Sequence, residues 1–373
     1  MFEFTKCQIC NTQPQILAAS LGICSECVKK NPEEAIERSR SSHSKNRAKW
    51  YLTPDIPNSL GGQQCHICSN ECLIGLGESG YCGIRKNVNG HLESIAGKNK
   101  ALLHTYLDPI PTNCCSTYFC PGGTSAGYPQ FSYHKGPERG YYNLACFLYG
   151  CNFSCLGCQN DQHRAVNAAE IYTFDKFVSK IQNNPKISCI CWFGGSPEPQ
   201  LSWALRASRR AKDAALERIL RVCWEWNGAG NSKLVQNAVA LSLRTGGNAK
   251  FDLKYFSPTL SQVLSGVSNE QSFKNFEICF NKFYHERKEN PVLTATTLLV
   301  PSYVDKEEVS NIAQFLASLD KSIPYSLLVF HPDSFLIDLP VTPLRQVKEC
   351  YEAAKNHLEN VHIGNKHLIG WAI

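Results

Sequence analysis

The sequence of 373 residues lacks several features that would define its class at once. It has no apolar run of about 18 residues, so no segment is long enough for a transmembrane helix. Its first residues, MFEFTKCQIC, do not show the basic and then apolar pattern of a secretory leader, and we therefore expect a cytoplasmic protein. The net charge of +6 is mild, so it allows an acidic partner without requiring one.

Cysteine, in contrast, is abundant, with 20 residues. In a small secreted protein this number would indicate disulfides, but a long chain without a leader is better explained by metal binding in a reducing cytoplasm. Apolar residues make up 43% and charged residues 19% of the chain, as in ordinary soluble globular proteins. Because open iron–sulfur sites are damaged by oxygen, we expect an anaerobic or well-protected setting.

The chain is organised around the loop CNFSCLGCQN, residues 151–160, in which Cys151, Cys155 and Cys158 have C-x3-C-x2-C spacing. An apolar run over 143–149 predicts a buried strand before the loop, and Gly150 allows a sharp turn out of it. Three thiolates on one loop can hold three irons of a [4Fe-4S] cluster and leave the fourth for an outside ligand. A zinc loop or three unrelated buried thiols is the alternative, but zinc would need a fourth ligand.

Two paired C-x2-C motifs at the start of the chain predict a four-thiolate site for zinc or mononuclear iron, formed by Cys7, Cys10, Cys24 and Cys27. Residues 29–50 are polar and basic and predict a solvated helix or linker. A nucleic-acid-binding arm is the weaker alternative, since the basic residues are scattered among Ser and Glu: Arg38, Arg40, Lys45, Arg47 and Lys49.

A second cysteine group predicts zinc or a second iron–sulfur cluster at Cys65, Cys68, Cys72 and Cys82. Three more cysteines follow within seven residues, Cys114, Cys115 and Cys120. We interpret them as a ligand loop that completes a site with a distant cysteine, and inert buried thiols are the alternative.

From about residue 141 the pattern changes to alternating strands and helices, which predicts a parallel α/β structure. The expected strands are 143–149, 187–193, 219–225, 249–253, 292–299 and 325–330, and the expected helices include 200–217, 272–287, 305–319 and 343–358. Right-handed crossovers would close the sheet part-way into a (β/α)6 barrel of the TIM type. The sequence thus divides into an N-terminal knuckle and linker (1–60), a cysteine-rich accessory region (61–140) and a core domain (141–373).

In such barrels the functional groups lie at the carboxyl ends of the strands. The glycine pair after the second strand would let the backbone approach a ligand, although a plain turn has the same pattern. Asp and Lys two apart after the fourth strand indicate a ligand or a mutual salt bridge. The candidate residues at these ends are Gly194, Gly195, Ser196, Glu225, Asn227, Asp252 and Lys254.

These motifs resemble those of the radical S-adenosylmethionine (SAM) superfamily, and within it those of the AmmeMemoRadiSam-type proteins and the pyruvate formate-lyase activating enzyme. The similarity covers roughly residues 64–373. The matching segments are the Cys65–Arg85 region, the 151–160 loop, Gly194–Gly195, Pro197–Gln200, the DLK at 252–254, GVSN at 266–269, the VP at 300–301, the HP at 331–332 and Gly364–Asn365.

The resemblance implies that the open iron chelates SAM and that the Gly194–Gly195 backbone binds its methionyl amino group. It also places Glu225 and Asp252 where the activating enzymes hold a monovalent cation. Two positions depart from the pattern. Ser196 replaces the usual Glu, and Gly157 replaces an aromatic residue near the adenine, so the adenine contact must come from elsewhere.

The implied activity is reductive cleavage of SAM to a 5′-deoxyadenosyl radical, which removes a hydrogen atom from a substrate such as a glycine of a partner protein. The implied partners are a reductant such as ferredoxin or flavodoxin and a protein substrate, with no membrane and no nucleic acid. A radical SAM methylase or RNA modifier is an alternative, although no segment of about 100 residues is left for a cobalamin domain. A non-catalytic iron–sulfur and zinc protein, for electron transfer or nucleic-acid binding, is the alternative from another class.

Overall fold

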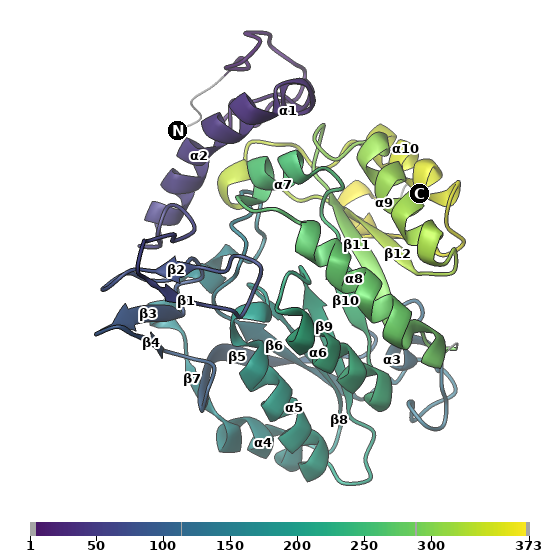
Figure 1. The fold of residues 1–373 in the computed structure, drawn as a ribbon. Helices are drawn as coiled ribbons and strands as arrows, with labels where there is room; N and C mark the ends of the chain where they lie inside the picture. Colours follow the sequence, from purple (N-terminus) through teal and green to yellow (C-terminus); the bar gives the residue numbers. More distant parts are fainter. Residues whose placement is uncertain (1–4, 113, 288, 371–373) are drawn as a thin grey trace.

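A computed structural model describes residues 5–112, 114–287 and 289–370, and a nine-stranded mixed sheet forms its centre (Figure 1). The strand order is β13-β12-β11-β10-β9-β8-β6-β5-β7. All neighbours from β6 to β13 are parallel, whereas β5 is antiparallel to both β6 and β7. The strands are β5 (Lys100–Pro109), β6 (Tyr142–Leu148), β7 (Ile171–Thr173), β8 (Ile187–Gly194), β9 (Arg221–Trp226), β10 (Ala249–Asp252), β11 (Leu293–Leu299), β12 (Tyr325–Val329) and β13 (Val361–Gly364).

Helices follow most of the parallel strands, as crossover connections require. In Figure 1, α4, α5, α6 and α8 lie along one side of the sheet. The helices are α1 (Ser25–Lys30), α2 (Pro32–Ala48), α3 (Pro121–Thr124), α4 (Phe174–Asn183), α5 (Leu201–Ala214), α6 (Ser232–Thr245), α7 (Pro258–Ser265), α8 (Glu270–Phe283), α9 (Lys306–Leu319) and α10 (Leu344–Lys355). Short 3₁₀ turns are η1 (Asp161–Arg164), η2 (Val166–Ala168), η3 (Glu198–Gln200), η4 (Tyr284–Glu286), η5 (Ser334–Leu336) and η6 (Lys366–Ile369).

The two faces of the sheet have different tasks because side chains alternate along each strand. On the face toward the helices, Trp192, Trp224 and Trp226 are fully buried and stacked, with ring centroids 6.1 and 5.5 Å apart along the row. The inner face carries Cys, Glu, Lys and Asn side chains that line a cavity. The apolar face therefore packs against the helices, whereas the polar inner face forms the wall of the cavity.

This architecture confirms the predicted α/β partial barrel and its six core strands. Two features at its edges were not predicted. β13 adds a seventh parallel strand beside β12, and β5 joins the same sheet from within the 61–140 region. The accessory region thus contributes a strand to the barrel sheet. Its small pairs are β1 (Gln63–Gln64) with β2 (Leu73–Ile74), and β3 (Arg85–Val88) with β4 (His91–Ser94).

The expected solvated segment after the N-terminal cysteines is helix α2, and the expectation of solvation is wrong for one of its faces. His43, Asn46 and Arg47 are at most 5% exposed. The Arg47 guanidinium lies 3.5 Å from the centroid of the Tyr81 ring and donates to the Tyr81 carbonyl oxygen at 2.6 Å. Arginine covers an aromatic face in this way when its charge is also satisfied by hydrogen bonds. α2 is therefore part of the packed structure.

Within the described ranges, none of the helices combines the length and the apolarity that a membrane span requires.

Candidate radical SAM site

The cluster loop, residues 151–158, leaves the end of β6 through Gly150. This glycine has φ +80°, and a Cβ there would lie 2.8 Å from the side chain of Ile84 and 3.1 Å from the carbonyl oxygen of Cys82. A larger residue is excluded both by the backbone conformation and by the space. All three cysteines of the loop line one cavity of about 530 Å³, with Cys151 buried and Cys155 and Cys158 half-buried.

Hydrogen bonds hold the loop in this shape. The N–H groups of Ser154 and Leu156 donate to the carbonyl oxygens of residues 265 and 264 at the end of α7, both at 2.9 Å. The buried Arg164 donates to the carbonyl oxygen of Cys155 at 2.8 Å and to Asn46 of α2 at 3.2 Å. The loop is therefore held in place from α7, η1 and α2.

The three thiols themselves fit a metal cluster. Burial raises the pKa of Cys158 to about 11, with Cys155 adding to the rise and Arg164 opposing it. Burial also raises the pKa of Cys151, and again the neighbouring Cys155 adds to it. Three sulfurs that repel one another as thiolates are stabilised by a metal that supplies positive charge. The donor set thus suits a thiolate-bound iron–sulfur group.

The glycine pair at the end of β8 lies against this loop. A Cβ at Gly195 would be 2.3 Å from the carbonyl oxygen of Gly150 and 2.8 Å from the His163 ring. Gly194 has φ +112°, and its Cβ would meet the backbone of Leu148 at 2.6 Å. Both glycines are required by the close approach of two backbones, and both line the cavity.

Ser196 and Asn227 join the loops that follow β6, β8 and β9. The Ser196 hydroxyl accepts hydrogen bonds from the Asn227 backbone N–H at 3.2 Å and side-chain amide at 3.1 Å. Asn227 also donates to the side-chain oxygen of Asn152, inside the cluster loop, at 2.8 Å. Ser196, at the position where the resembling family has an acid, therefore connects three strand ends in this protein.

Glu198 is a residue of this region that the sequence did not single out. Its side chain is fully buried and accepts a hydrogen bond from the Gly228 N–H at 2.7 Å. Burial raises the pKa of Glu198 to about 7, although hydrogen bonds from Ser196 and Gly228 oppose the rise. The signal for it was present in the GGSPEP segment, where the acid lies two residues after the serine.

The acids expected to bind a cation each face a lysine. Asp252 and Lys254 form an ion pair at 2.7 Å, so the mutual salt bridge weighed from the sequence is present. Glu225 lies beside Lys250 at 3.1 Å on the neighbouring strand. Asp252, Lys254 and Glu225 all line the cavity, and a cation at Glu225 and Asp252 stays a prediction.

Gly157 makes room for apolar side chains from another part of the chain. A Cβ at Gly157 would lie 3.1 Å from both Leu336 and Phe330. These two residues follow β12 and occupy the place next to the third cysteine. Leu298, Val300 and Leu336 are apolar residues that line the cavity.

Comparison with known proteins agrees with this geometry: residues 146–316 match the family model described as the radical SAM superfamily. The chain carries a radical SAM domain. An uncharacterized protein of Methanocaldococcus jannaschii is 27% identical over 316 residues, which are 81% of each chain. A second protein of that organism, named "Putative glycyl-radical enzyme activating enzyme", is 24% identical over 58% of this chain and 86% of its own.

Among solved structures, the chain is similar to a domain of the pyruvate-formate lyase-activating enzyme from Bacteroides vulgatus. The similarity covers 47% of this chain and 98% of that domain, with 18% sequence identity and a TM-score of 0.36. The family of the radical SAM domain implies SAM and a [4Fe-4S] cluster as its cofactors.

The second cysteine group lies directly against the radical SAM domain. The Ser69 N–H donates to the carbonyl oxygen of Ala229 at 2.9 Å, and Asn70 donates to that of Asn152 at 2.7 Å. Burial raises the pKa of Cys68, and the thiols of Cys82, Cys72 and Cys65 add to the rise. A metal site formed by Cys65, Cys68, Cys72 and Cys82 stays a prediction.

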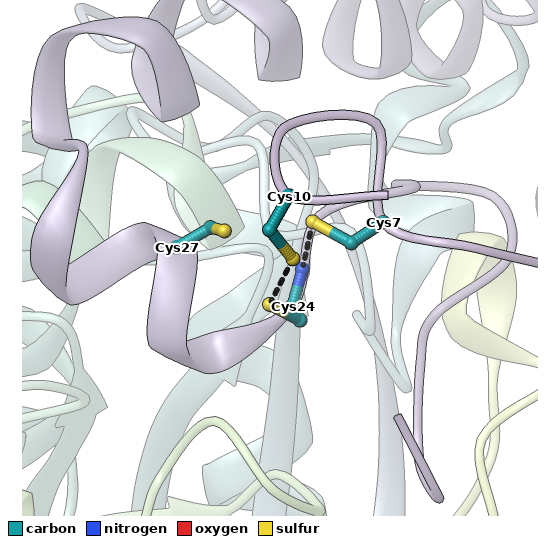
Figure 2. Close-up of side chains that lie close together, drawn as sticks. All are labelled: Cys7, Cys10, Cys24 and Cys27. Atoms are coloured by element: carbon teal, nitrogen blue, oxygen red, sulfur yellow. Dashed lines mark hydrogen bonds between the residues drawn. The ribbon is translucent and has the colours of Figure 1, made fainter. Parts of the chain in front are cut away.

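The first cysteine group is compact enough for one metal ion. The sulfurs of Cys7, Cys10, Cys24 and Cys27 all lie within 4.8 Å of one another (Figure 2). The Cys7 sulfur accepts from the Cys24 N–H at 3.4 Å, and a hydrogen bond with Thr12 lowers the pKa of Cys10 to about 6. N–H···S bonds and a low thiol pKa both favour thiolates, the form that binds metal. The group is placed to hold a metal, and the choice between zinc and iron stays a prediction.

The segment 19–29, which carries Cys24 and Cys27, is bonded to the radical SAM domain. Tyr303 donates to the Ile23 carbonyl oxygen at 2.7 Å, and Lys29 pairs with Asp305 at 2.8 Å. Ala19 and Ser20 donate to the Asp338 carboxylate and the Phe335 carbonyl oxygen.

The loop around Cys114 and Cys120 enters the barrel. Both cysteines line the same cavity as the cluster loop, together with Cys189, Cys191 and Cys223 of β8 and β9. The sequence predicted that this loop would meet a distant cysteine. It did not identify these three partners, because a cysteine inside an apolar strand run has the pattern of an ordinary core residue.

Proposed function

We propose that the protein is a radical SAM enzyme of the activating type, which generates a radical for hydrogen-atom abstraction from a partner protein. The observation that carries the proposal is that Cys151, Cys155 and Cys158 open into one cavity with Gly194 and Gly195. A reduced cluster with SAM on its open iron would supply the electron that cleaves SAM to methionine and a 5′-deoxyadenosyl radical.

The residues of the chain bind and orient the reactants. Gly194 and Gly195 line the cavity and carry no side chains, so SAM bound there would approach their backbone with its methionyl end. A cavity of about 530 Å³ falls in the range of about 300–1,000 Å³ found for small-molecule sites.

A protein substrate is supported by the relative named as an activating enzyme. A glycine on an exposed flexible loop of a partner would present its hydrogen atom at the cavity. A methylase or an RNA modifier would use the same cofactors, but no feature of the described cavity favours either.

The test is anaerobic reduction of the reconstituted protein with SAM, followed by measurement of 5′-deoxyadenosine. We expect production in the wild type, loss in Cys155→Ala, and retention in Cys350→Ala, in which a buried cysteine of α10 far from the loop is removed. No product above background in the reconstituted wild type would refute the proposal. Addition of a candidate partner should then give a glycyl-radical signal in electron paramagnetic resonance (EPR) spectra.

A further inference from the structure

The cavity is lined by further thiols that belong to none of the three cysteine groups predicted as complete metal sites. We name as the barrel thiols the five cysteines outside the 151–158 loop that line the cavity. Two come from the loop that ends in α3, and three come from inward positions of the neighbouring parallel strands β8 and β9: Cys114, Cys120, Cys189, Cys191 and Cys223.

The barrel thiols converge from both sides. The sulfurs of Cys189 and Cys223 are 3.6 Å apart across the two strands. The sulfurs of Cys114 and Cys191 contact the same Lys250 ammonium, at 3.0 and 3.4 Å. The entering loop and the strands therefore present their thiols to one another in a shared space.

A buried positive charge accompanies them. The Lys250 side chain is 1% exposed, and its nearest carboxylate is Glu225 at 3.1 Å. A buried ammonium needs compensating negative charge, and two sulfurs in its contact shell supply it best as thiolates or as ligands of an anionic metal group. The positive charge of Lys250 would therefore stabilise negative charge on the neighbouring thiols.

Ordinary packing does not account for the arrangement. The cysteines that serve as core residues, Cys146, Cys279 and Cys350, are 0% exposed and surrounded by apolar neighbours. The barrel thiols instead face free volume, and four of the five are only half-buried although they lie inside the barrel. Apolar packing would have filled this volume with larger side chains.

The number and kind of donors favour a cluster over a single ion. A tetrahedral ion takes four sulfurs close together, as in the N-terminal group, where all four lie within 4.8 Å of one another. Among the described residues the five barrel thiols do not form a second such group, although Cys189 and Cys223 are 3.6 Å apart. An all-sulfur donor set selects soft metals and iron–sulfur clusters.

We propose that the barrel thiols hold a second iron–sulfur cluster inside the barrel, on the same cavity as the radical SAM cluster and with Lys250 as its counter-charge. A reactant bound in the cavity would then lie between two iron–sulfur groups. The site is separate from the Cys65–Cys82 group, whose four cysteines are not among the described residues that line the cavity.

The test compares iron and acid-labile sulfide after anaerobic reconstitution. The parent carries Cys151→Ala, Cys155→Ala and Cys158→Ala, which removes the radical SAM cluster. One derivative adds Cys189→Ala and Cys223→Ala, and the matched control adds Cys279→Ala and Cys350→Ala instead. We expect the first derivative to lose at least about two irons and two sulfides per chain relative to the parent, and the control to lose none. Unchanged iron and sulfide, or a loss of zinc in place of iron, would overturn the proposal.

A second variant tests the site without changing the barrel thiols. Its folding is checked by circular dichroism and by the zinc or iron bound at the N-terminal group. It keeps the barrel thiols and removes seven other cysteines, which are the three of the radical SAM loop and the four of the Cys65–Cys82 group. We expect this variant to retain iron and sulfide with an EPR signal that SAM does not change. A variant that folds but binds neither iron nor sulfide would refute the barrel site. Neither measurement depends on SAM cleavage.

Discussion

The buried acid Glu198 predicts an unusual dependence of stability on pH. Burial raises the pKa of Glu198 from its ordinary value of 4.5 to about 7. Below pH 4.5 the folded and unfolded chains are both protonated at this position. Between pH 4.5 and 7 the unfolded chain releases the proton first, so the free energy of unfolding falls as pH rises, and above pH 7 the penalty stays constant.

The size of the effect follows from the shift in pKa. One pKa unit corresponds to about 1.4 kcal/mol, so the charged Glu198 costs up to about 3 kcal/mol above pH 7. Glu198→Gln removes the titration. It keeps a side-chain oxygen that can accept the hydrogen bond from the Gly228 N–H, which is 2.7 Å long in the wild type. We therefore expect the variant to gain stability relative to the wild type as pH rises, with little difference near pH 4.5 from this source.

The assay is thermal unfolding of wild type and variant from pH 5.5 to 8, under anaerobic conditions and with the same metal content. The shift in Tm per kcal/mol falls as chains lengthen, and at about 2.1 cal/mol/K per residue it is about 1.3 °C for a chain of 373 residues. The difference in Tm should therefore move toward the variant by about 2–3 °C, because about 2 kcal/mol of the penalty develops between pH 5.5 and 8. Glu277→Gln, at an exposed position of α8, is the matched control and should show no such trend. A difference that stays constant with pH, or that favours the wild type at high pH, would refute the reasoning.

Three further predictions concern other parts of the molecule. Gly195→Ala inserts a Cβ 2.3 Å from a backbone oxygen, and we expect it to cost about 1–3 kcal/mol and to weaken SAM binding, measured as the SAM-induced change in the cluster EPR signal; unaltered binding would contradict the close fit. Glu138→Gln breaks a buried, bidentate pair with Arg221, at 2.9 and 2.6 Å, so urea unfolding should show a loss of about 3–5 kcal/mol, and a loss below 1 kcal/mol would show that the pair is not isolated from water. Cys7→Ser with Cys10→Ser should remove one metal ion per chain in elemental analysis, whereas unchanged metal content would exclude the N-terminal site.

Local patterns predicted the parts of this protein that are local in the chain. The C-x3-C-x2-C loop carries its three thiols within eight residues, and the N-terminal group is formed by two short C-x2-C turns. The six core strands were visible as apolar runs because both faces of a parallel sheet are covered over much of its area. In these features, residues that are close in the sequence are also close in the structure.

The features that sequence missed arise from distant parts of the chain. Cys114 and Cys191 contact the same Lys250 only because the loop before α3 enters the barrel, and Cys191 and Cys223 are placed together by strand pairing. One usable signal was the alternation of Cys189 with Cys191, two residues apart, which puts both on the inner face of β8. Arg47 was also missed, because a basic residue in a polar segment gives no sign that it will cover the buried Tyr81.

The segment 333–338 connects the cluster loop to the segment that carries the N-terminal cysteines. Its Phe335 N–H donates to the Leu156 carbonyl oxygen in the cluster loop at 2.9 Å, while Phe335 and Asp338 accept from Ser20 and Ala19 beside the N-terminal cysteines. Loss of the metal predicted at those cysteines would therefore loosen the contacts that hold segment 333–338 against the cluster loop. The N-terminal site would in this way influence the geometry of the proposed radical SAM cluster from a distance along the chain.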